Sequence, residues 1–118
     1  MFFENSPFEI LEQAFKELYP DKKYTAYLSP GLQDENGEEV FGYTDFGTEE
    51  PVVMVDAGLG AMQATEIGAH ELAHVAAGKE AGHGEEWEKA FDAIHDRYNE
   101  ILEKKEKQEK QNGKRNHL

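Results

Sequence analysis

The feature that most constrains the fold of this 118-residue chain is a pair of histidines four residues apart, His70 and His74, with Glu71 directly after the first. Apolar and small residues recur around them from about residue 61, and Gly78 is a suitable C-terminal cap, so we predict a helix here. Positions four apart on a helix share one face, close enough to hold one tetrahedral zinc ion. Glu71 projects about 100° round from His70, beside the ion's open position. The pattern therefore predicts a zinc site in which Glu71 takes a proton from the zinc-bound water and later delivers it to the leaving amine.

A catalytic zinc needs a third protein ligand. The part of the chain that follows the motif offers three candidates. His83 is the leading one, because Gly82 and Gly84 on either side of it let the backbone swing the ring back towards the helix. His95, on the final predicted helix, is the rival, and the carboxylate of Glu88 is a further option. The residue pattern alone leaves these alternatives open.

Two stretches together resemble a known family, the SprT-like zinc metallopeptidases, whose pattern is H-E-x-x-H followed by H-G-x-x-[FW]. They are His70-Glu71-Leu72-Ala73-His74 and Gly82-His83-Gly84-Glu85-Glu86-Trp87. The extended segment 52–59 before the helix is also similar, and the likeness covers roughly residues 40–100. The resemblance implies that His70, His74 and His83 bind one zinc ion and that Trp87 packs the last helix against the site.

The remaining pattern predicts an α+β fold in the order helix, sheet, helix, helix. A capping box with proline at the first helical position, Ser6–Glu9, opens a helix that Pro20 ends. Strand-like runs broken by turn residues predict a small, mainly antiparallel sheet of three or four strands, with runs at 23–28, 40–43 and 52–55. A long last helix starts near Glu85, and its apolar stripe ends at Leu102. We therefore expect one minimal zincin-like metallopeptidase domain over 1–103 and a charged, frayed C-terminal tail over 104–118.

Composition excludes several classes of protein and site. The chain has no cysteine, which removes disulfides, zinc ribbons and iron–sulfur clusters. Residues 1–103 hold six Lys and Arg against 23 Asp and Glu, so nucleic acid is not expected to bind this acidic body. No apolar run is long enough to span a membrane, and the first residues do not form a signal peptide, so we expect a cytoplasmic protein.

The function expected from these patterns is zinc-dependent hydrolysis of a peptide or protein substrate. We expect the substrate to lie extended along a strand edge near Val52–Asp56, pairing backbone to backbone. The residue that stabilises the oxyanion is open among four candidates, which are Tyr43, His95, Arg97 and Tyr98. The alternatives are a catalytically inactive zinc-binding adaptor with the same fold, and an interaction protein whose histidine pair is incidental.

Overall fold

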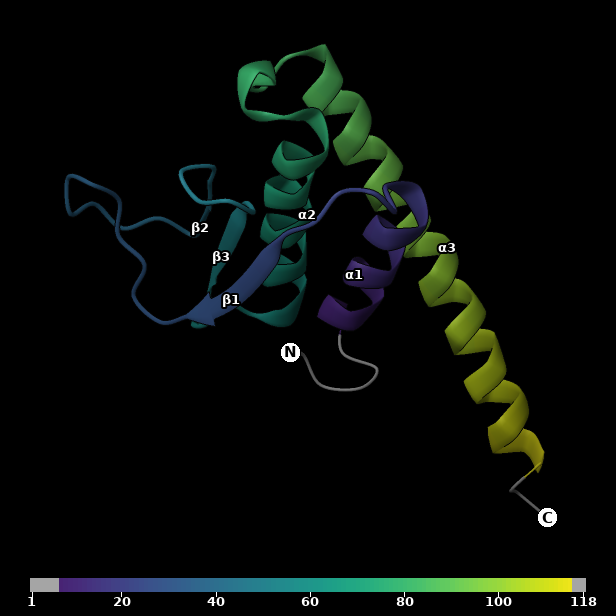
Figure 1. The fold of residues 1–118 in the computed structure, drawn as a ribbon. Helices are drawn as coiled ribbons and strands as arrows, with labels where there is room; N and C mark the ends of the chain where they lie inside the picture. Colours follow the sequence, from purple (N-terminus) through teal and green to yellow (C-terminus); the bar gives the residue numbers. More distant parts are fainter. Residues whose placement is uncertain (1–6, 116–118) are drawn as a thin grey trace.

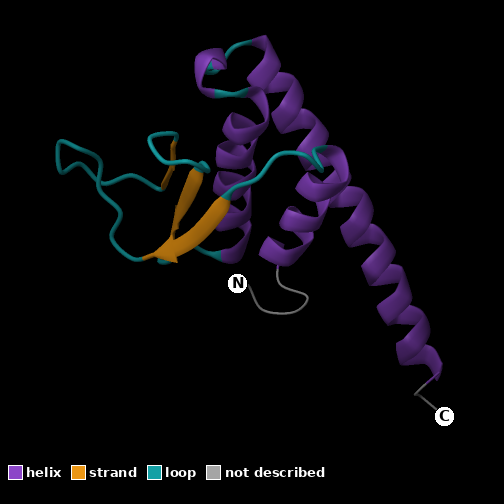
Figure 2. Ribbon diagram, in the orientation of Figure 1, coloured by secondary structure: helices purple, strands orange, loops and turns teal. Residues whose placement is uncertain are grey.

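The computed structural model describes residues 7–115 and has an α+β fold, as predicted. Three helices form one layer and a small sheet lies against one side of them (Figures 1 and 2). In chain order the elements are α1 (Pro7–Leu18), β1 (Thr25–Ser29), β2 (Gly42–Asp45), β3 (Val52–Asp56), α2 (Ala61–Ala77), the 3-10 turn η1 (Lys79–Ala81) and α3 (Glu85–Arg115).

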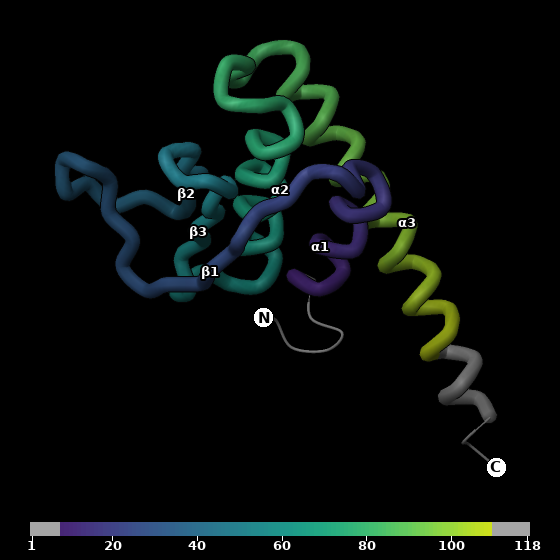
Figure 3. Tube along the Cα trace, in the orientation of Figure 1, coloured from purple at the N-terminus to yellow at the C-terminus, as the bar shows by residue number. Residues whose placement is uncertain are grey.

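The sheet is mixed, with strand order β1-β3-β2. The strand β3 pairs parallel with β1 and antiparallel with β2, so only one of its two pairings has the direction expected from the sequence. A long connection joins β1 to β2 and is visible as the blue loop in Figure 3. It carries the chain away from β1, so that β2 does not pair with β1 and β3 lies between them. The valine-rich run Val52–Val55 therefore belongs to the central strand, where both edges are paired. This corrects the expectation that a substrate pairs with Val52–Asp56, because that strand has no open edge.

Alternate residues of β3 face α2 and form the centre of the core. Val53 and Val55 are buried there together with Leu72 of α2, while Phe15 of α1 and Ile94 of α3 are fully enclosed in the same cluster. Alternation of buried and half-buried residues along β3 means that the helices cover one face of the sheet. The core therefore fixes α2, which carries the histidine pair, between the sheet and α3.

Gly42 allows β2 to lie close to α2. A Cβ atom at this position would come 2.6 Å from Cγ2 of Ile67, 2.9 Å from the carbonyl oxygen of Met54 and 3.4 Å from Cγ of Glu71. Any larger residue must move either the strand or the helix, since the second contact is with backbone. The absence of a side chain at Gly42 therefore sets the separation between the sheet and the glutamate of the motif.

The helix α3 is much longer than the others and continues past the body of the protein (Figure 3). Over the part of α3 whose burial is described, residues 85–109, the last buried residue is Ile101, which packs with Ile10 and Ala14 of α1. Helical backbone nevertheless extends to Arg115. The division into a domain over 1–103 and a tail over 104–118 stays a prediction. Within the described part of the chain, no helix combines the length and the apolar character needed to cross a bilayer.

Candidate metal centre

The last turns of α2 bring His70 and His74 together on one face of the helix. Their rings are 5.1 Å apart between centroids and lie edge to face, and both side chains are half-buried. Leu72, on the opposite side of the helix, and the small residues Ala69 and Ala73, one position before each histidine, are buried in the core. The pair thus occupies the position that the i, i+4 spacing predicts.

A tight connection after α2 returns His83 to this pair. The helix ends at Ala77, and Gly78 and Gly82 both take positive φ values, +94° and +55°, that disfavour any residue with a side chain. Figure 1 shows the connection folding over the end of α2 before α3 begins. As a result, Nε2 of His83 lies 3.1 Å from Nε2 of His74 and 3.2 Å from Nε2 of His70.

Three histidines therefore lie close enough to bind one metal ion, with ligand atoms all within 4.8 Å of one another. Two nitrogens bound to a tetrahedral zinc ion at about 2.0–2.1 Å are about 3.3 Å apart, close to the distance of His83 from each of the other two histidines. Hydrogen bonding accounts for this spacing less well. A neutral ring nitrogen is either a donor or an acceptor along one direction, whereas Nε2 of His83 faces two partners at once. The donor set thus fits a metal ion that prefers imidazole.

Burial favours the neutral form of the two helical histidines, which is the form that binds metal. It lowers the pKa of His74 to about 4, with His70 and His83 nearby adding to the shift. Burial also lowers the pKa of His70, with a smaller contribution from His83. The lowered pKa values mean that protons compete less with a metal ion for the lone pair of each ring.

Trp87, in the first turn of α3, holds the three imidazoles together. Its ring centroid lies 4.8 Å from that of His70, 5.7 Å from that of His74 and 4.9 Å from that of His83. Its indole Nε1 donates a hydrogen bond of 3.2 Å to the backbone carbonyl of His70, and its ring stacks on that of Phe91. Trp87 thus packs α3 against the site, as the resemblance implies.

Glu71 lies beside the histidines but points into the protein. It is the one buried charged residue in the described part of the chain, with 6% of its surface exposed. Its Oε1 accepts a hydrogen bond of 2.9 Å from the hydroxyl of Thr44 on β2, and its Oε2 lies 4.0 Å from Nε2 of His70. Burial raises the pKa of Glu71, and the Thr44 hydrogen bond partly opposes that rise. One carboxylate oxygen is therefore fixed to the sheet while the other faces the imidazole cluster.

Thr44 is the residue of this site that the sequence analysis missed. It faces α2 because it is in register with Val53, which points into the core. Nothing in the sequence around Thr44 marks it as part of a site, since only the pairing of β2 with β3 determines which face it takes. A threonine in a strand-like run is by itself an ordinary strand residue.

The other candidate ligands lie outside the histidine cluster. Among the described residues, neither His95 nor Glu88 belongs to the group whose ligand atoms converge. Nδ1 of His95 instead lies 3.4 Å from the amide nitrogen of Asn99 on the same helix. The side chain of His95 lines a surface hollow of about 440 Å³, together with Met62 and Leu102.

The candidates for oxyanion stabilisation are scattered. Arg97 pairs with Glu17 of α1 and, at 2.8 Å, with Glu100, so its guanidinium is already engaged at the surface. Tyr98 packs against the core. Tyr43 belongs to β2 but is in register with Met54, on the face of the sheet opposite to Thr44. Within residues 7–115, none of these side chains belongs to the group of ligand atoms that converge at the histidines.

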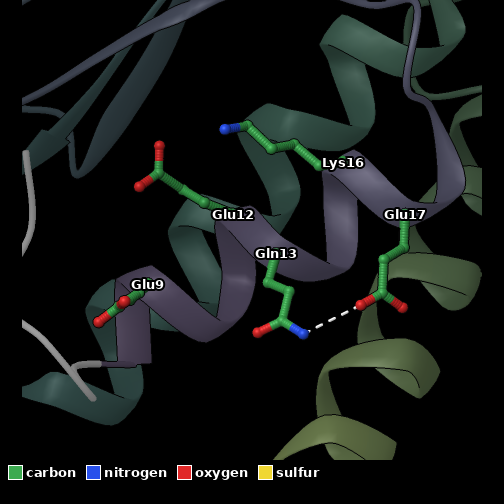
Figure 4. A pocket seen from close by; sticks show the side chains of 5 residues that line it. All are labelled: Glu9, Glu12, Gln13, Lys16 and Glu17. Carbon is green, nitrogen blue, oxygen red and sulfur yellow. Dashed lines mark hydrogen bonds between the residues drawn. The ribbon is translucent and has the colours of Figure 1, made fainter.

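A second hollow, of about 410 Å³, lies on the surface of α1 and is shown in Figure 4. Its lining comes from one helix alone, and the only hydrogen bond drawn within it joins Gln13 to Glu17, at 3.0 Å. The lining residues are Glu9, Glu12, Gln13, Lys16 and Glu17. Because they hold no group of converging ligand atoms, the histidine cluster is the stronger candidate for chemistry.

Comparison with known proteins adds no relative to this description. No protein-family model, no curated protein and no solved structure matches the chain.

Proposed function

We propose that this protein is a zinc metallopeptidase in which His70, His74 and His83 hold one zinc ion and Glu71 is the catalytic acid–base residue. One observation carries the proposal. Nε2 of His83 lies 3.1–3.2 Å from Nε2 of both other histidines, all three ligand atoms lie within 4.8 Å of one another, and a buried carboxylate lies next to them without taking part in the cluster. A histidine-only donor set with a neighbouring carboxylate suits hydrolysis better than a purely structural zinc site, in which all four positions are filled by protein.

When bound, zinc would supply a Lewis acid that polarises the scissile carbonyl and makes water more acidic. The role proposed for Glu71 is to transfer a proton from water to the leaving amine. Its Oε2 faces the cluster, 4.0 Å from Nε2 of His70, so it can accept a proton from water there and return it to the leaving amine. A buried carboxyl with a raised pKa holds that proton more readily than an exposed one.

The open edge of β2 is the place for an extended peptide in this proposal. The backbone N–H of Asp56 donates to the carbonyl of Phe41 at 2.8 Å, which marks these residues as a hydrogen-bonded pair. Such pairs alternate in antiparallel sheets, so Tyr43 also bonds to β3, and the backbone groups of Gly42 and Thr44 turn towards the open edge. A substrate strand added there would run past the same threonine that contacts Glu71.

Charge favours neutral or basic substrates in this proposal. Exposed carboxylates lie at the end of β2, in the loop after it and in the first turn of α3, which adjoins the histidines. They are Asp45, Glu49, Glu50, Glu85, Glu86 and Glu88. A cationic peptide would be drawn towards this region at low ionic strength, and an acidic peptide would be repelled.

The test is cleavage of a proteome-derived peptide library by the zinc-loaded protein, with new termini identified by mass spectrometry. We expect cleavage by the wild type and a loss of about 100-fold or more in Glu71→Gln, which removes the proton acceptor but should keep the zinc. Equal zinc binding with no cleavage by either protein would favour the inactive adaptor. Failure of the wild type to bind zinc would favour the interaction protein with incidental histidines.

A further inference from the structure

The hydroxyl of Thr44 contacts Glu71 at two points. Oγ1 lies 2.9 Å from the carboxylate Oε1 and 3.1 Å from the backbone carbonyl oxygen of the same residue. A single hydroxyl proton can serve either oxygen, so the two contacts hold the side chain of Glu71 next to its own backbone. The glutamate is thereby restricted to one orientation by an atom from a different element of the fold.

This contact depends on how the sheet meets the helix. Gly42, two residues earlier in β2, lets the strand approach α2 closely, and register with Val53 turns Thr44 inwards. The carboxylate is almost wholly enclosed, and a buried carboxylate without a hydrogen-bond donor would be costly. Thr44 supplies that donor at Oε1 and leaves Oε2 as the oxygen that faces the imidazoles.

We propose that Thr44 is a positioning residue for Glu71: its hydroxyl holds Oε1, so that Oε2 is the oxygen presented to the reacting water. This inference rests on the peptidase function proposed above. The proton moves between water, Oε2 of Glu71 and the leaving amine, while Thr44 keeps its own proton and only donates a hydrogen bond. A carboxylate free to rotate would spend less time in the productive orientation, which lowers the rate of the chemical step rather than substrate binding.

The test compares Thr44→Val, which keeps the shape but lacks the hydroxyl, with Thr44→Ser, which keeps the hydroxyl. Thr25→Val is the matched control, because Thr25 is a half-buried strand threonine on β1, the far edge of the sheet. All are loaded with zinc and assayed on one fluorogenic peptide taken from the library. We expect kcat to fall about 10- to 100-fold in Thr44→Val with KM within about 3-fold of wild type. Thr44→Ser should recover most of kcat, and Thr25→Val should leave it unchanged.

A second measurement does not depend on activity. Unfolding equilibria of the zinc-free protein are measured for Thr44→Val, Glu71→Ala and the double variant, since such a cycle isolates the energy of a contact. We expect the two changes to be coupled by at least about 3-fold in the unfolding equilibrium constant. Independent effects would show that the contact is absent in solution and would overturn the inference.

The outcomes separate this inference from the proposed function. If Glu71→Gln abolishes cleavage while Thr44→Val retains full kcat, the peptidase proposal stands and the positioning role is overturned. If Thr44→Ser is as impaired as Thr44→Val, the hydroxyl is not the active feature and the role is again overturned. If the wild type cleaves nothing, the proposed function fails, and the positioning role fails with it even where the coupling is measured.

Discussion

The indole Nε1 of Trp87 donates a hydrogen bond to the backbone carbonyl of His70, joining the first turn of α3 to the helix that carries the histidine pair. The same ring lies against all three imidazoles. Residues that contact the metal ligands and fix their orientation, without binding the metal themselves, commonly raise metal affinity 10- to 100-fold. The contact therefore links the packing of α3 to the order of the candidate metal site.

We predict that Trp87→Ala lowers zinc affinity about 10- to 100-fold, and that Trp87→Phe lowers it less. Phenylalanine keeps an aromatic surface beside the imidazoles but has no N–H for the carbonyl of His70. Competition with a chromophoric chelator measures both affinities. Equal affinity in Trp87→Ala and wild type would show that the imidazoles hold their arrangement without the indole.

The choice of third ligand gives a second prediction. We expect His83→Ala to weaken zinc binding about 100-fold or more, because two imidazoles remain where three converge. We expect His95→Ala to bind zinc as the wild type does, since its side chain lines a different hollow on the surface. Calorimetric titration of both variants with zinc decides the matter, and loss of affinity in His95→Ala alone would reverse the assignment.

The positions of the helical site residues were predictable because they depend only on the spacing of residues within one helix. Spacing of four residues places His70 and His74 on one helix face whatever the rest of the chain does. The two glycines around His83 likewise signal a turn in the sequence itself, and the structure uses positive φ at Gly82. Local rules therefore placed His70 and His74 on one face and made His83 the leading third candidate, but they left His95 and Glu88 open, because the position of a residue beyond the helix depends on the path of the connection.

The sheet was predicted less well because its arrangement depends on contacts distant in sequence. The strand-like runs were found, but their order and direction follow from a long connection that places β3 between β1 and β2. A strand's face and its open edge are set by its neighbours, not by its own residues. Thr44 was missed for this reason, and the same cause led to the expectation of an open edge at Val52–Asp56.

The close approach at Gly42 gives a third prediction. We expect Gly42→Ala to destabilise the fold by about 1–3 kcal/mol, because the new methyl group would collide with Ile67 and with backbone of β3. Gly60→Ala is the matched control, since Gly60 has an ordinary φ of −65° and a Cβ there would meet no atom within 4 Å. Denaturant unfolding of both variants measures the difference, and equal stability would mean that β2 can move away from α2 at little cost.

Stability at alkaline pH gives the fourth prediction, which concerns Tyr24. Its hydroxyl donates a hydrogen bond of 3.1 Å to Glu12, and its ring meets Phe15 edge to face. Burial, assisted by the nearby Glu12 carboxylate, raises the pKa of Tyr24 well above its usual value of 10. The unfolded chain therefore loses this proton near pH 10 while the folded protein keeps it. The free energy of unfolding should be insensitive to this group below pH 10 and should fall as the pH rises above it.

Tyr24→Phe removes that titration, so its free energy of unfolding should decline less steeply than that of the wild type between about pH 10 and 12. Some decline should remain, because burial also raises the pKa of Tyr19 and Tyr98. Tyr27→Phe is the control, since Tyr27 is 54% exposed on β1 and its change should leave the wild-type slope intact. Urea unfolding followed by circular dichroism at a series of pH values measures the slopes. Parallel curves for Tyr24→Phe and wild type would show that the phenol loses its proton as easily in the folded protein as in the unfolded chain.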